Sequence, residues 1–424
     1  LAFGEQSPTA LFLNNGDGTF TDITATAGVP GGATALAPAL GDINNDGWLD
    51  IFIASPGHVD FDFLPADFGP TEFDGNRLYL SNGLDANGNL TFTDISESAG
   101  VDDALGACVA GFSDYDNDGL IDIYVGNCNF AVGSTLTPAP FNLYRNNGPD
   151  ANGNITFTDV AQEAGIAQPG LWMSFAPGDY DNDGDIDFFA SNAGSGVQQP
   201  HAFYRNNGDG TFTNIAVDLG VANLEFGWRA TLSDFDNDGH QDLYFTGSFP
   251  FVPVPGNPGR LFFNDRQGGF NQANLEDTGA DLSERYPTGV ARGDYNGDGF
   301  EDVVVVTTTL FDLQSGELLD QGTPVLLRNS GNDHNWLTLR LVGTDSNRSA
   351  IGAKVQVVSG ELEQVRELAA GSSFASSESP WLSFGLADNE FATVEVTWPS
   401  GLVESYQIDE VNRIITLTEG EGEQ

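Results

Sequence analysis

A nine-residue acidic turn occurs five times along the chain, and this repeat limits the fold more than any other feature of the sequence. Every copy has Asp at positions 1, 5 and 9, Asp or Asn at position 3, and Gly at position 6. Carboxylates a few ångströms apart repel one another, so five such turns indicate that a cation sits in each. The copies are DINNDGWLD at 42–50, DYDNDGLID at 114–122, DYDNDGDID at 179–187, DFDNDGHQD at 234–242 and DYNGDGFED at 294–302, and we call them turns 1–5.

A second repeat alternates with the acidic turns and consists of two short apolar runs around a segment rich in Gly and Asn. Its copies lie at 11–29, 78–101, 143–166 and 203–221, with a degraded copy at 261–280 and the start of another at 326–331. Short apolar runs between turn residues predict strands, and Asn-Gly and Asp-Gly favour hairpins. Each unit therefore has about four short strands, which predicts a β-propeller.

The repeats predict about five blades, and six or seven remain open. The N-terminal copy lacks a first half, and the fifth unit lacks its last strand. The simplest closure lets residues 19–24 (TFTDIT) complete the fifth blade and leaves residues 10–15 as an extra strand. The long variable loops at 55–76 and 246–260 are expected to project from one face and to contact partners.

After about residue 332 the pattern changes to strands in which apolar and polar residues alternate. This alternation predicts strands with one buried face, and the set predicts a small β-sandwich of roughly 90 residues. We therefore expect a propeller over residues 1–331 and a sandwich over residues 332–424. The predicted sandwich strands are 336–342, 354–358, 364–368, 381–386, 393–398 and 414–417.

The acidic turns suit Ca²⁺, which takes six to eight oxygen ligands at about 2.3–2.6 Å. Side chains at positions 1, 3, 5 and 9 and the backbone carbonyl at position 7 can wrap one ion, because Gly at position 6 allows a sharp turn. Mg²⁺ prefers to keep its waters, and Zn²⁺ prefers His and Cys ligands. About five Ca²⁺ are therefore expected. The predicted ligands are Asp42, Asn44, Asp46, Trp48 and Asp50; Asp114, Asp116, Asp118, Leu120 and Asp122; Asp179, Asp181, Asp183, Asp185 and Asp187; Asp234, Asp236, Asp238, His240 and Asp242; and Asp294, Asn296, Asp298, Phe300 and Asp302.

An EF-hand is excluded by the residue at position 12. An EF-hand has Glu there and helices on both sides. In this chain position 12 is always apolar and lies within a strand pattern. The five residues are Ile53, Val125, Ala190, Phe245 and Val305.

The charge of the chain excludes some partners. The formal net charge is −48 and Lys354 is the only lysine, so the basic patch that binds nucleic acid or an anionic membrane surface is missing. No apolar run approaches the roughly 18 residues of a membrane span. The first residue is Leu and no signal-like segment follows it, so we expect a mature or trimmed chain. An acidic surface fits divalent cation sites, a salt-adapted host, or both.

The only two cysteines, Cys108 and Cys128, each lie six residues from turn 2. If turn 2 joins two antiparallel strands, these residues can face each other and form a disulfide. Two small buried residues are an equally good interpretation. A disulfide would favour an oxidising compartment.

Both repeats resemble FG-GAP/VCBS repeats, the Ca²⁺-binding blades also found in integrin α-chains. The C-terminal region resembles the ASPIC/UnbV domain, and the two together resemble the cartilage acidic protein family, which has many bacterial members. The resemblance covers nearly the whole chain. The C-terminal segments that carry it are NWLTLRLV at 335–342, SNRSAIGAKVQVV at 346–358, VRELAAGS at 365–372, LSFGL at 382–386 and VEVTWPSG at 394–401.

This resemblance implies a propeller fused to a transthyretin-like sandwich. It also implies that a sandwich loop, residues 371–380 (GSSFASSESP) in this chain, plugs the propeller channel, and that K⁺ ions lie between blades. Propellers of the family usually have seven blades, whereas this chain has five acidic turns. No enzymatic activity is established for the family as a whole, so the resemblance indicates fold better than function.

Three functions remain open. We favour a secreted, periplasmic or cell-surface Ca²⁺-binding interaction or adhesion protein, whose ligand is an unknown protein or glycan. The alternatives are a propeller lyase or hydrolase with its site at the channel mouth, and a structural acidic protein of a salt-adapted organism. No catalytic constellation is visible, because His58, His201, His240 and His334 are scattered. The RGD motif at 292–294 shares Asp294 with turn 5, so that carboxylate is expected to face an ion.

Overall fold

The computed structural model describes residues 10–29, 35–55, 75–103, 105–128, 138–193, 199–248, 257–283, 285–307, 309–311, 318–372 and 377–423. Within these ranges the chain is built almost entirely of strands. The helices are single turns of four residues: α1 (Thr24–Ala27), α2 (Ser96–Ala99) and α3 (Leu275–Thr278). His58 and most of the two variable loops, 55–76 and 246–260, lie outside the described residues.

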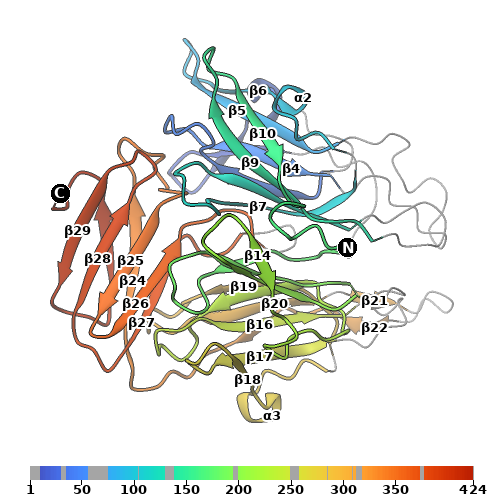
Figure 1. The fold of residues 1–424 in the computed structure, drawn as a ribbon, viewed down its shortest axis with the longest axis vertical. Helices are drawn as coiled ribbons and strands as arrows, with labels where there is room; N and C mark the ends of the chain where they lie inside the picture. The colour runs from blue at the N-terminus through green and yellow to red at the C-terminus, as the bar shows by residue number, and fades with distance from the viewer. Residues whose placement is uncertain are drawn as a thin grey trace.

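Five antiparallel sheets follow one another along the chain, and we call them blades 1–5 (Figure 1). In each blade, neighbouring strands along the chain are neighbours in the sheet, as the repeats predict. The strands are β3 (Ala37–Gly41), β4 (Asp50–Ala54), β5 (Arg77–Leu84) and β6 (Leu90–Asp94) in blade 1; β7 (Ala107–Ser113), β8 (Asp122–Asn127), β9 (Asn142–Pro149) and β10 (Ile155–Asp159) in blade 2; β11 (Ala176–Gly178), β12 (Asp187–Ala190), β13 (Ala202–Asn206) and β14 (Phe212–Asn214) in blade 3; β15 (Arg229–Ser233), β16 (Asp242–Gly247), β17 (Asn257–Asn264) and β18 (Phe270–Gln272) in blade 4; and β19 (Pro287–Gly293), β20 (Asp302–Thr307) and β23 (Val325–Leu327) in blade 5.

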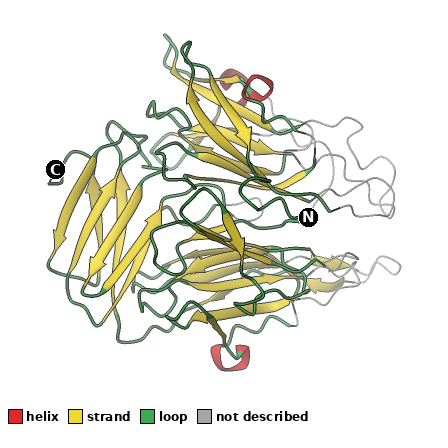
Figure 2. Cartoon of the chain, in the orientation of Figure 1, coloured by secondary structure: helices red, strands yellow, loops and turns green. Residues whose placement is uncertain are grey.

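The first strands of successive blades lie at the centre of the molecule. Strand β3 packs beside β7, β11 beside β15, and β15 beside β19. Blades 2 and 3 meet through the rings of Tyr124 and Phe175, whose centroids are 4.4 Å apart. The arrangement is propeller-like and has the expected number of about five blades, but the described sheets do not close into a ring (Figures 1 and 2).

The predicted closure of the fifth blade is wrong. Strand β2 (Phe20–Asp22) pairs with β1 (Phe12–Asn14) in a separate hairpin, and the third strand of blade 5 is β23. A hairpin between adjacent segments closes a much shorter loop than a strand pairing across the molecule, so it costs less entropy. Phe12 and Phe20 are 56% and 62% exposed in this hairpin. A further hairpin of β21 (Thr309–Phe311) and β22 (Leu318–Gln321) stands between β20 and β23.

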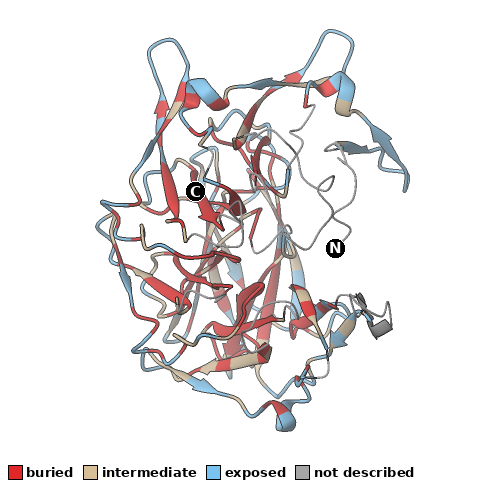
Figure 3. Ribbon diagram, turned by 90° about the vertical axis from the view of Figure 1, so that its right-hand side faces the viewer, coloured by how far each residue is buried: buried red, intermediate tan, exposed pale blue. Residues whose placement is uncertain are grey.

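Buried residues concentrate in the strands at the centre, and the outer turns are exposed (Figure 3). The repeated aromatic positions form the contacts between neighbouring blades. Phe188 in blade 3, for example, contacts Tyr124 and Phe141 of blade 2 at centroid distances of 5.3 and 5.8 Å. Full burial of such a ring stabilises the fold by about 1.5–3 kcal/mol, so the apolar strands of each repeat also join the blades.

The C-terminal strands form a sandwich with a core of its own, which includes Leu337, Val355 and Trp398. Six of its strands were predicted, and the alternation of buried and exposed residues follows the expected pattern. Strand β29 was not predicted. One sheet has the order β27 (Leu382–Ala387), β24 (Asn335–Val342), β30 (Arg413–Thr418), and the other has the order β26 (Leu362–Glu367), β25 (Lys354–Ser359), β28 (Ala392–Thr397), β29 (Val403–Ile408).

Candidate metal centres

Each acidic turn joins the first two strands of a blade, so its carboxylates gather at one end of the sheet. Position 1 directly follows the first strand, and position 9 begins the second, as Asp114 and Asp122 do around β7 and β8. The Gly at position 6 has a φ between 85° and 94° in all five turns, as expected. Position 4 is also left-handed. It is Asn in turns 1–4, with φ between 55° and 58°, and Gly297 in turn 5.

The carboxylate at position 1 holds the backbone of its own turn. In turn 2 the N–H of Asp118 donates to Asp114 Oδ1 at 3.0 Å, and the N–H of Gly119 donates to Asp114 Oδ2 at 2.9 Å. The same two hydrogen bonds occur in the other four turns, at 2.8–3.2 Å. This carboxylate therefore shapes the turn before any ion is considered.

The carboxylate at position 9 ties the turn to the third strand of the blade. Asp122 Oδ2 accepts a hydrogen bond from the N–H of Tyr115 at 3.2 Å, and Oδ1 accepts one from the N–H of Asn146 in β9 at 2.8 Å. Equivalent pairs occur at position 9 of the other four turns. Position 9 therefore has a structural role in every blade.

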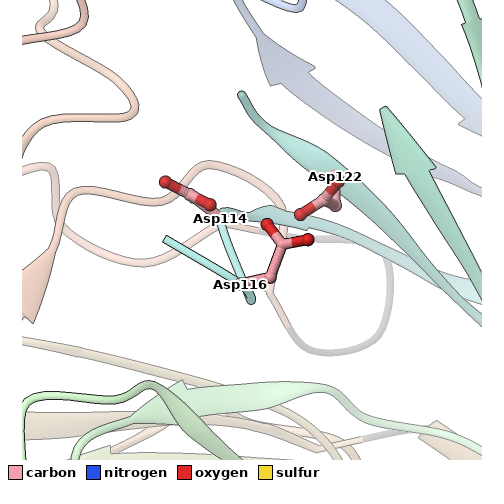
Figure 4. A group of neighbouring side chains, drawn as sticks. All are labelled: Asp114, Asp116 and Asp122. Carbon is pink, nitrogen blue, oxygen red and sulfur yellow. The ribbon is translucent and has the colours of Figure 1, made fainter. Parts of the chain in front are cut away.

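Three carboxylates converge in each of the middle turns. In turns 2, 3 and 4, the aspartates at positions 1, 3 and 9 each offer an oxygen atom, and these atoms all lie within 4.8 Å of one another. Figure 4 shows this group in turn 2, with the carboxylate of Asp116 directed toward that of Asp122. The groups are Asp114, Asp116 and Asp122; Asp179, Asp181 and Asp187; and Asp234, Asp236 and Asp242.

One oxygen atom in each of these groups has no protein partner. The Oδ1 atoms of Asp116, Asp181 and Asp236, all at position 3, are buried and accept no hydrogen bond from the part of the chain that the structure describes. A buried oxygen without a partner costs roughly 1–3 kcal/mol, and more if it is charged. The Oδ1 atom at position 3 is unpartnered in three separate turns. This indicates that each of the three turns binds the same kind of ligand at this atom.

Burial raises the pKa of the carboxyls at positions 1 and 9 of turns 2–4. The pKa of Asp114 rises to about 6, and the pKa values of Asp179 and Asp234 rise to about 7, chiefly through desolvation. At position 9 of the middle turns, desolvation raises the pKa well above its usual range, and neighbouring carboxylates add to the shift. Without a cation, these close-packed carboxyls therefore hold their protons at a higher pH than isolated aspartates do.

The middle groups fit a divalent cation. Two oxygens bound to one Ca²⁺ at about 2.3–2.6 Å can lie at most roughly 5 Å apart, and the three carboxylates meet that limit. The aspartates at position 5 do not join these groups in the described turns. Asp118 Oδ1 instead accepts a hydrogen bond from the N–H of Leu120 at 2.9 Å. Asp238 pairs with Arg266 at 2.5 Å; burial raises its pKa, but bonds from His240 and Arg266 outweigh this and lower it.

Turns 1 and 5 have the same backbone conformation as turns 2–4, but the residue at position 3 is Asn instead of Asp. The amide of Asn44 donates to Asp46 Oδ2 at 2.9 Å, and that of Asn296 donates to Asp298 Oδ2 at 2.7 Å. In turn 1, desolvation still raises the pKa of Asp42 to about 6 and that of Asp50 to about 7. Turn 1 therefore keeps buried carboxylates at positions 1 and 9, and turn 5 keeps one at position 9, but both turns have an amide in place of the carboxylate at position 3.

The structure also places the two cysteines and the RGD motif. Cys108 and Cys128 form a disulfide at the far ends of β7 and β8, with their Cα atoms 5.6 Å apart and no exposed surface. Arg292 pairs with Glu301 at 2.6 Å and with Glu378 of the sandwich. Asp294 accepts hydrogen bonds from the backbone of its own turn. The motif is therefore occupied by internal contacts.

Two further features of the turns were not predicted. The Asn at position 4 donates to the next acidic turn along the chain, as in the bond from Asn182 Nδ2 to the carbonyl of Gly239 at 2.9 Å. The sandwich also contacts the turns, for instance through Lys354 Nζ, which lies 2.8 Å from the carbonyl of Gly184. The Asn in four of the five turns is a visible sequence signal for the first feature. The second pairs residues about 170 positions apart, so no local pattern reveals it.

Two family models match the chain. The model described as FG-GAP-like repeat matches residues 1–53, 114–190 and 192–245, and the model described as ASPIC and UnbV matches residues 343–424. Cartilage acidic protein 1 from Mus musculus and from Homo sapiens is 26% identical over 418 residues, which cover 97% of this chain and 49% and 48% of those proteins. The chain therefore spans about half the length of the curated relatives that it matches.

Solved structures resemble the chain only distantly. A rhamnogalacturonan lyase, YesW, shares 15% identity over 72% of this chain and 64% of its own, with a TM-score of 0.34. An exo-β-1,3-galactanase from Clostridium thermocellum shares 11% identity over 88% of this chain and 82% of its own, with a TM-score of 0.30. These scores are too low to carry an argument about activity. Among the described residues, no helix has the length and apolar character needed to cross a bilayer.

Proposed function

This chain joins FG-GAP-like repeats to an ASPIC/UnbV domain and is homologous to cartilage acidic protein 1, and from this premise we propose that it is a Ca²⁺-binding interaction protein. We place it outside the cytoplasm: secreted, periplasmic or at the cell surface. Its ligand is a protein or a glycan. The disulfide between Cys108 and Cys128 supports such a location, because disulfides persist in oxidising compartments.

The metal assignment rests mainly on the buried, unpartnered Oδ1 atoms of Asp116, Asp181 and Asp236. Each lies in a group of three carboxylates whose oxygens are close enough for one ion. We propose Ca²⁺ in all five turns, with backbone carbonyls, position 5 side chains and waters completing the shell. Turns 1 and 5 would offer Asn44 and Asn296 as neutral ligands at position 3.

The cations would stabilise the turns that hold each blade together. A cation that binds only the folded chain stabilises it by about 2.7 kcal/mol per independent site at a concentration 100 times its Kd. Five such sites would make the metal-free protein markedly less stable.

We also propose the division into a propeller over residues 1–331 and a sandwich over residues 332–424, with residues 371–380 as a plug. Residues 373–376 lie outside the described residues. On either side of them, Gly371 lies against Ala39 and Ala110, and Glu378 accepts a hydrogen bond from Thr231 at 3.0 Å. These contacts reach the first strands of blades 1, 2 and 4, which supports the plug. The K⁺ ions expected between blades remain a proposal without assigned residues.

A thermal melt with metal analysis tests this function. The protein as isolated would be analysed for bound metal, then melted in EGTA and again with added Ca²⁺ at constant ionic strength. We expect close to five Ca²⁺ per chain and a large rise in Tm on Ca²⁺ addition. No bound Ca²⁺ and a Tm that follows ionic strength alone would overturn the metal assignment and favour a salt-adapted acidic protein. A separate screen of the Ca²⁺-loaded protein against glycans and extracellular proteins tests the interaction role.

A further inference from the structure

The C-terminal sandwich contacts all five acidic turns. Figure 1 shows it beside the ends of the blades. At turn 1, a Cβ on Gly47 would lie 3.1 Å from the carbonyl of Asp345. At turn 5, a Cβ on Gly299 would overlap the ring of Trp336. In turns 1 and 5, the glycine at position 6 therefore also permits close approach of the sandwich.

Turns 2 and 3 are joined to the sandwich by polar contacts. Lys354 Nζ lies 2.5 Å from Asn117 Oδ1 of turn 2 and 2.8 Å from the carbonyl of Gly184 in turn 3. The carboxylate of Glu367 accepts a hydrogen bond from the N–H of Asp114 at 3.2 Å, next to the strand that leads into turn 2. In turns 2 and 3, the groups that bind the sandwich are two backbone groups and the side-chain amide at position 4 of turn 2.

Turn 4 is in close van der Waals contact with β27. A Cβ on Gly385 would overlap the carboxylate of Asp234 and the backbone of Asn237. The N–H of Ala387 donates to the carbonyl of Asn237 at 3.0 Å. Arg366, which is 6% exposed, offsets part of the burial effect on the pKa values of Asp179 and Asp234.

These contacts depend on the conformation of the turns. The groups that face the sandwich, such as the carbonyls of Gly184 and Asn237, belong to the backbone that bends around the carboxylate groups. The three carboxyls of each group repel one another when they are ionised, which favours expansion of this backbone, whereas a bound cation favours the compact form. A ligand that prefers one conformation shifts the population toward it.

We propose that the acidic turns form the docking face for the C-terminal sandwich, and that cation binding in turns 2–4 controls this docking. The inference rests on the proposed metal sites and adds a regulatory role to them. Loss of the cations loosens the sandwich. It also withdraws Glu378 from Arg292 and Thr231, and so opens the central strands of blades 4 and 5.

Hydrogen exchange of the full chain tests the proposal directly. The amide of Ala387 reports docking, because its acceptor lies in turn 4 and Ala387 is not a metal ligand. Val396 pairs with Val355 inside the sandwich and serves as an internal control. We expect exchange of peptides containing Ala387 to be about 5- to 150-fold faster in EGTA than in Ca²⁺, the usual range of coupling between two sites, with Val396 unchanged.

The reciprocal experiment measures Ca²⁺ affinity in sandwich variants. Coupling between two binding events is mutual, so weaker docking must weaken Ca²⁺ binding. Lys354→Met removes the contacts to turns 2 and 3 and keeps the apolar stem, whereas Gly385→Ala places a methyl group against turn 4. Arg413→Met is the matched control, because Arg413 is 52% exposed and pairs only within the sandwich, with Glu410. We expect about 5-fold or greater weakening in the first two variants and none in the third.

The outcomes separate the two proposals. Calcium binding by the wild-type chain with an unchanged exchange rate at Ala387, and unchanged affinity in Lys354→Met, would overturn controlled docking and leave the metal sites standing. Faster exchange at Ala387 in Ca²⁺ than in EGTA would also overturn it, because the coupling would have the opposite sign. No Ca²⁺ bound to the wild-type chain would overturn the metal sites, and this inference with them.

Discussion

The middle turns and the outer turns share one backbone and differ in the residue at position 3. In turns 2–4 this residue is an aspartate with a buried oxygen that has no partner, whereas in turns 1 and 5 it is an asparagine that donates to the aspartate at position 5. The hydrogen bonds made by positions 1 and 9 are the same in both sets. The turn can therefore form without a carboxylate at position 3, which agrees with the proposal that this carboxylate binds a cation.

Burial differs most between turn 4 and turn 5. Turn 4 is the most enclosed, with Asp234, Asp238 and Asp242 all no more than 5% exposed. Turn 5 stands at the end of the described blades, and Tyr295 within it is 58% exposed. Electrostatic interactions are stronger where water is excluded, so a change in turn 4 should have more effect than the same change in turn 5.

The largest expected effect compares position 9 in turns 4 and 5. Asp242 accepts hydrogen bonds from the N–H groups of Phe235 and Asn264 at 2.9 and 2.8 Å. Asp242→Ala would leave both buried N–H groups without an acceptor, at about 1–3 kcal/mol each, and would remove a proposed metal ligand. We expect a loss of about 2–6 kcal/mol in the free energy of unfolding with Ca²⁺ present, measured by urea denaturation.

Asp302→Ala is the matched change in turn 5. Asp302 makes the same two hydrogen bonds, but both are only partly buried, whereas those of Asp242 are buried, so about half the loss is expected. Equal losses in the two variants would show that burial does not distinguish the turns.

Acid should weaken the middle blades through a residue outside the turns. His201 is 1% exposed between blades 3 and 4, where its ring lies 5.7 Å from that of Phe189 and 4.9 Å from that of Phe245. Desolvation lowers the pKa of His201 from 6.5 to about 3. The unfolded chain therefore binds a proton below pH 6.5 that the folded chain does not, and the stability present above pH 6.5 is lost as the pH falls.

Between pH 7 and pH 5 this loss should reach about 2 kcal/mol, at about 1.4 kcal/mol per pH unit below 6.5. His201→Gln removes the titrating group, so its stability in EGTA should fall by about 2 kcal/mol less than that of the wild type over the same range. The wild type must be compared with this variant because the buried carboxyls of the turns, whose pKa values are raised, make the stability change with pH in the direction opposite to that of His201. The same pH dependence in wild type and variant would contradict the prediction.

An exchange of residues at position 3 tests the comparison most directly. Asp181→Asn gives turn 3 the position 3 residue of turn 1, and Asn44→Asp gives turn 1 that of turn 3. Site affinity for Ca²⁺ depends on the number of charged ligands, so we expect about tenfold weaker binding at turn 3 in the first variant and about tenfold tighter binding at turn 1 in the second. Titration against a chromophoric chelator measures both. No change in either variant would mean that position 3 does not contact the ion.

The sequence predicted the parts of this molecule that are local and repeated. The acidic turns between the first two strands, the four-stranded units and the alternating strands of the sandwich all follow from patterns within about ten residues. The pairing of β1 with β2 was missed, because the repeat pattern does not say which edge a strand joins. The contact of Lys354 with turns 2 and 3 was missed, because it joins segments that only the complete fold brings together.

The residue at position 4 combines a local feature with a distant contact. The repeated Asn is visible in the sequence, but the carbonyl group that it binds in the following turn is not. The asparagine at this position donates to the following turn, as in the bonds from Asn45 Nδ2 to the carbonyl of Gly119 and from Asn237 Nδ2 to that of Gly299, both 3.1 Å. A left-handed backbone suits both Asn and Gly, so the amide is present for its contact and not for the turn itself. Turn 5 has Gly297 here, and a Cβ on it would meet no atom within 4 Å.

The smallest expected effect follows from this difference. Asn237→Gly keeps the left-handed conformation and removes one buried hydrogen bond between turns 4 and 5, so we expect a loss of about 1 kcal/mol in the free energy of unfolding. Gly297→Asn adds an amide where no following turn is described, and its stability should stay within about 0.5 kcal/mol of the wild type. Urea denaturation in Ca²⁺ measures both. If the two variants lose equal stability, the amide at position 4 acts within its own turn, and the contact between turns contributes nothing that can be measured.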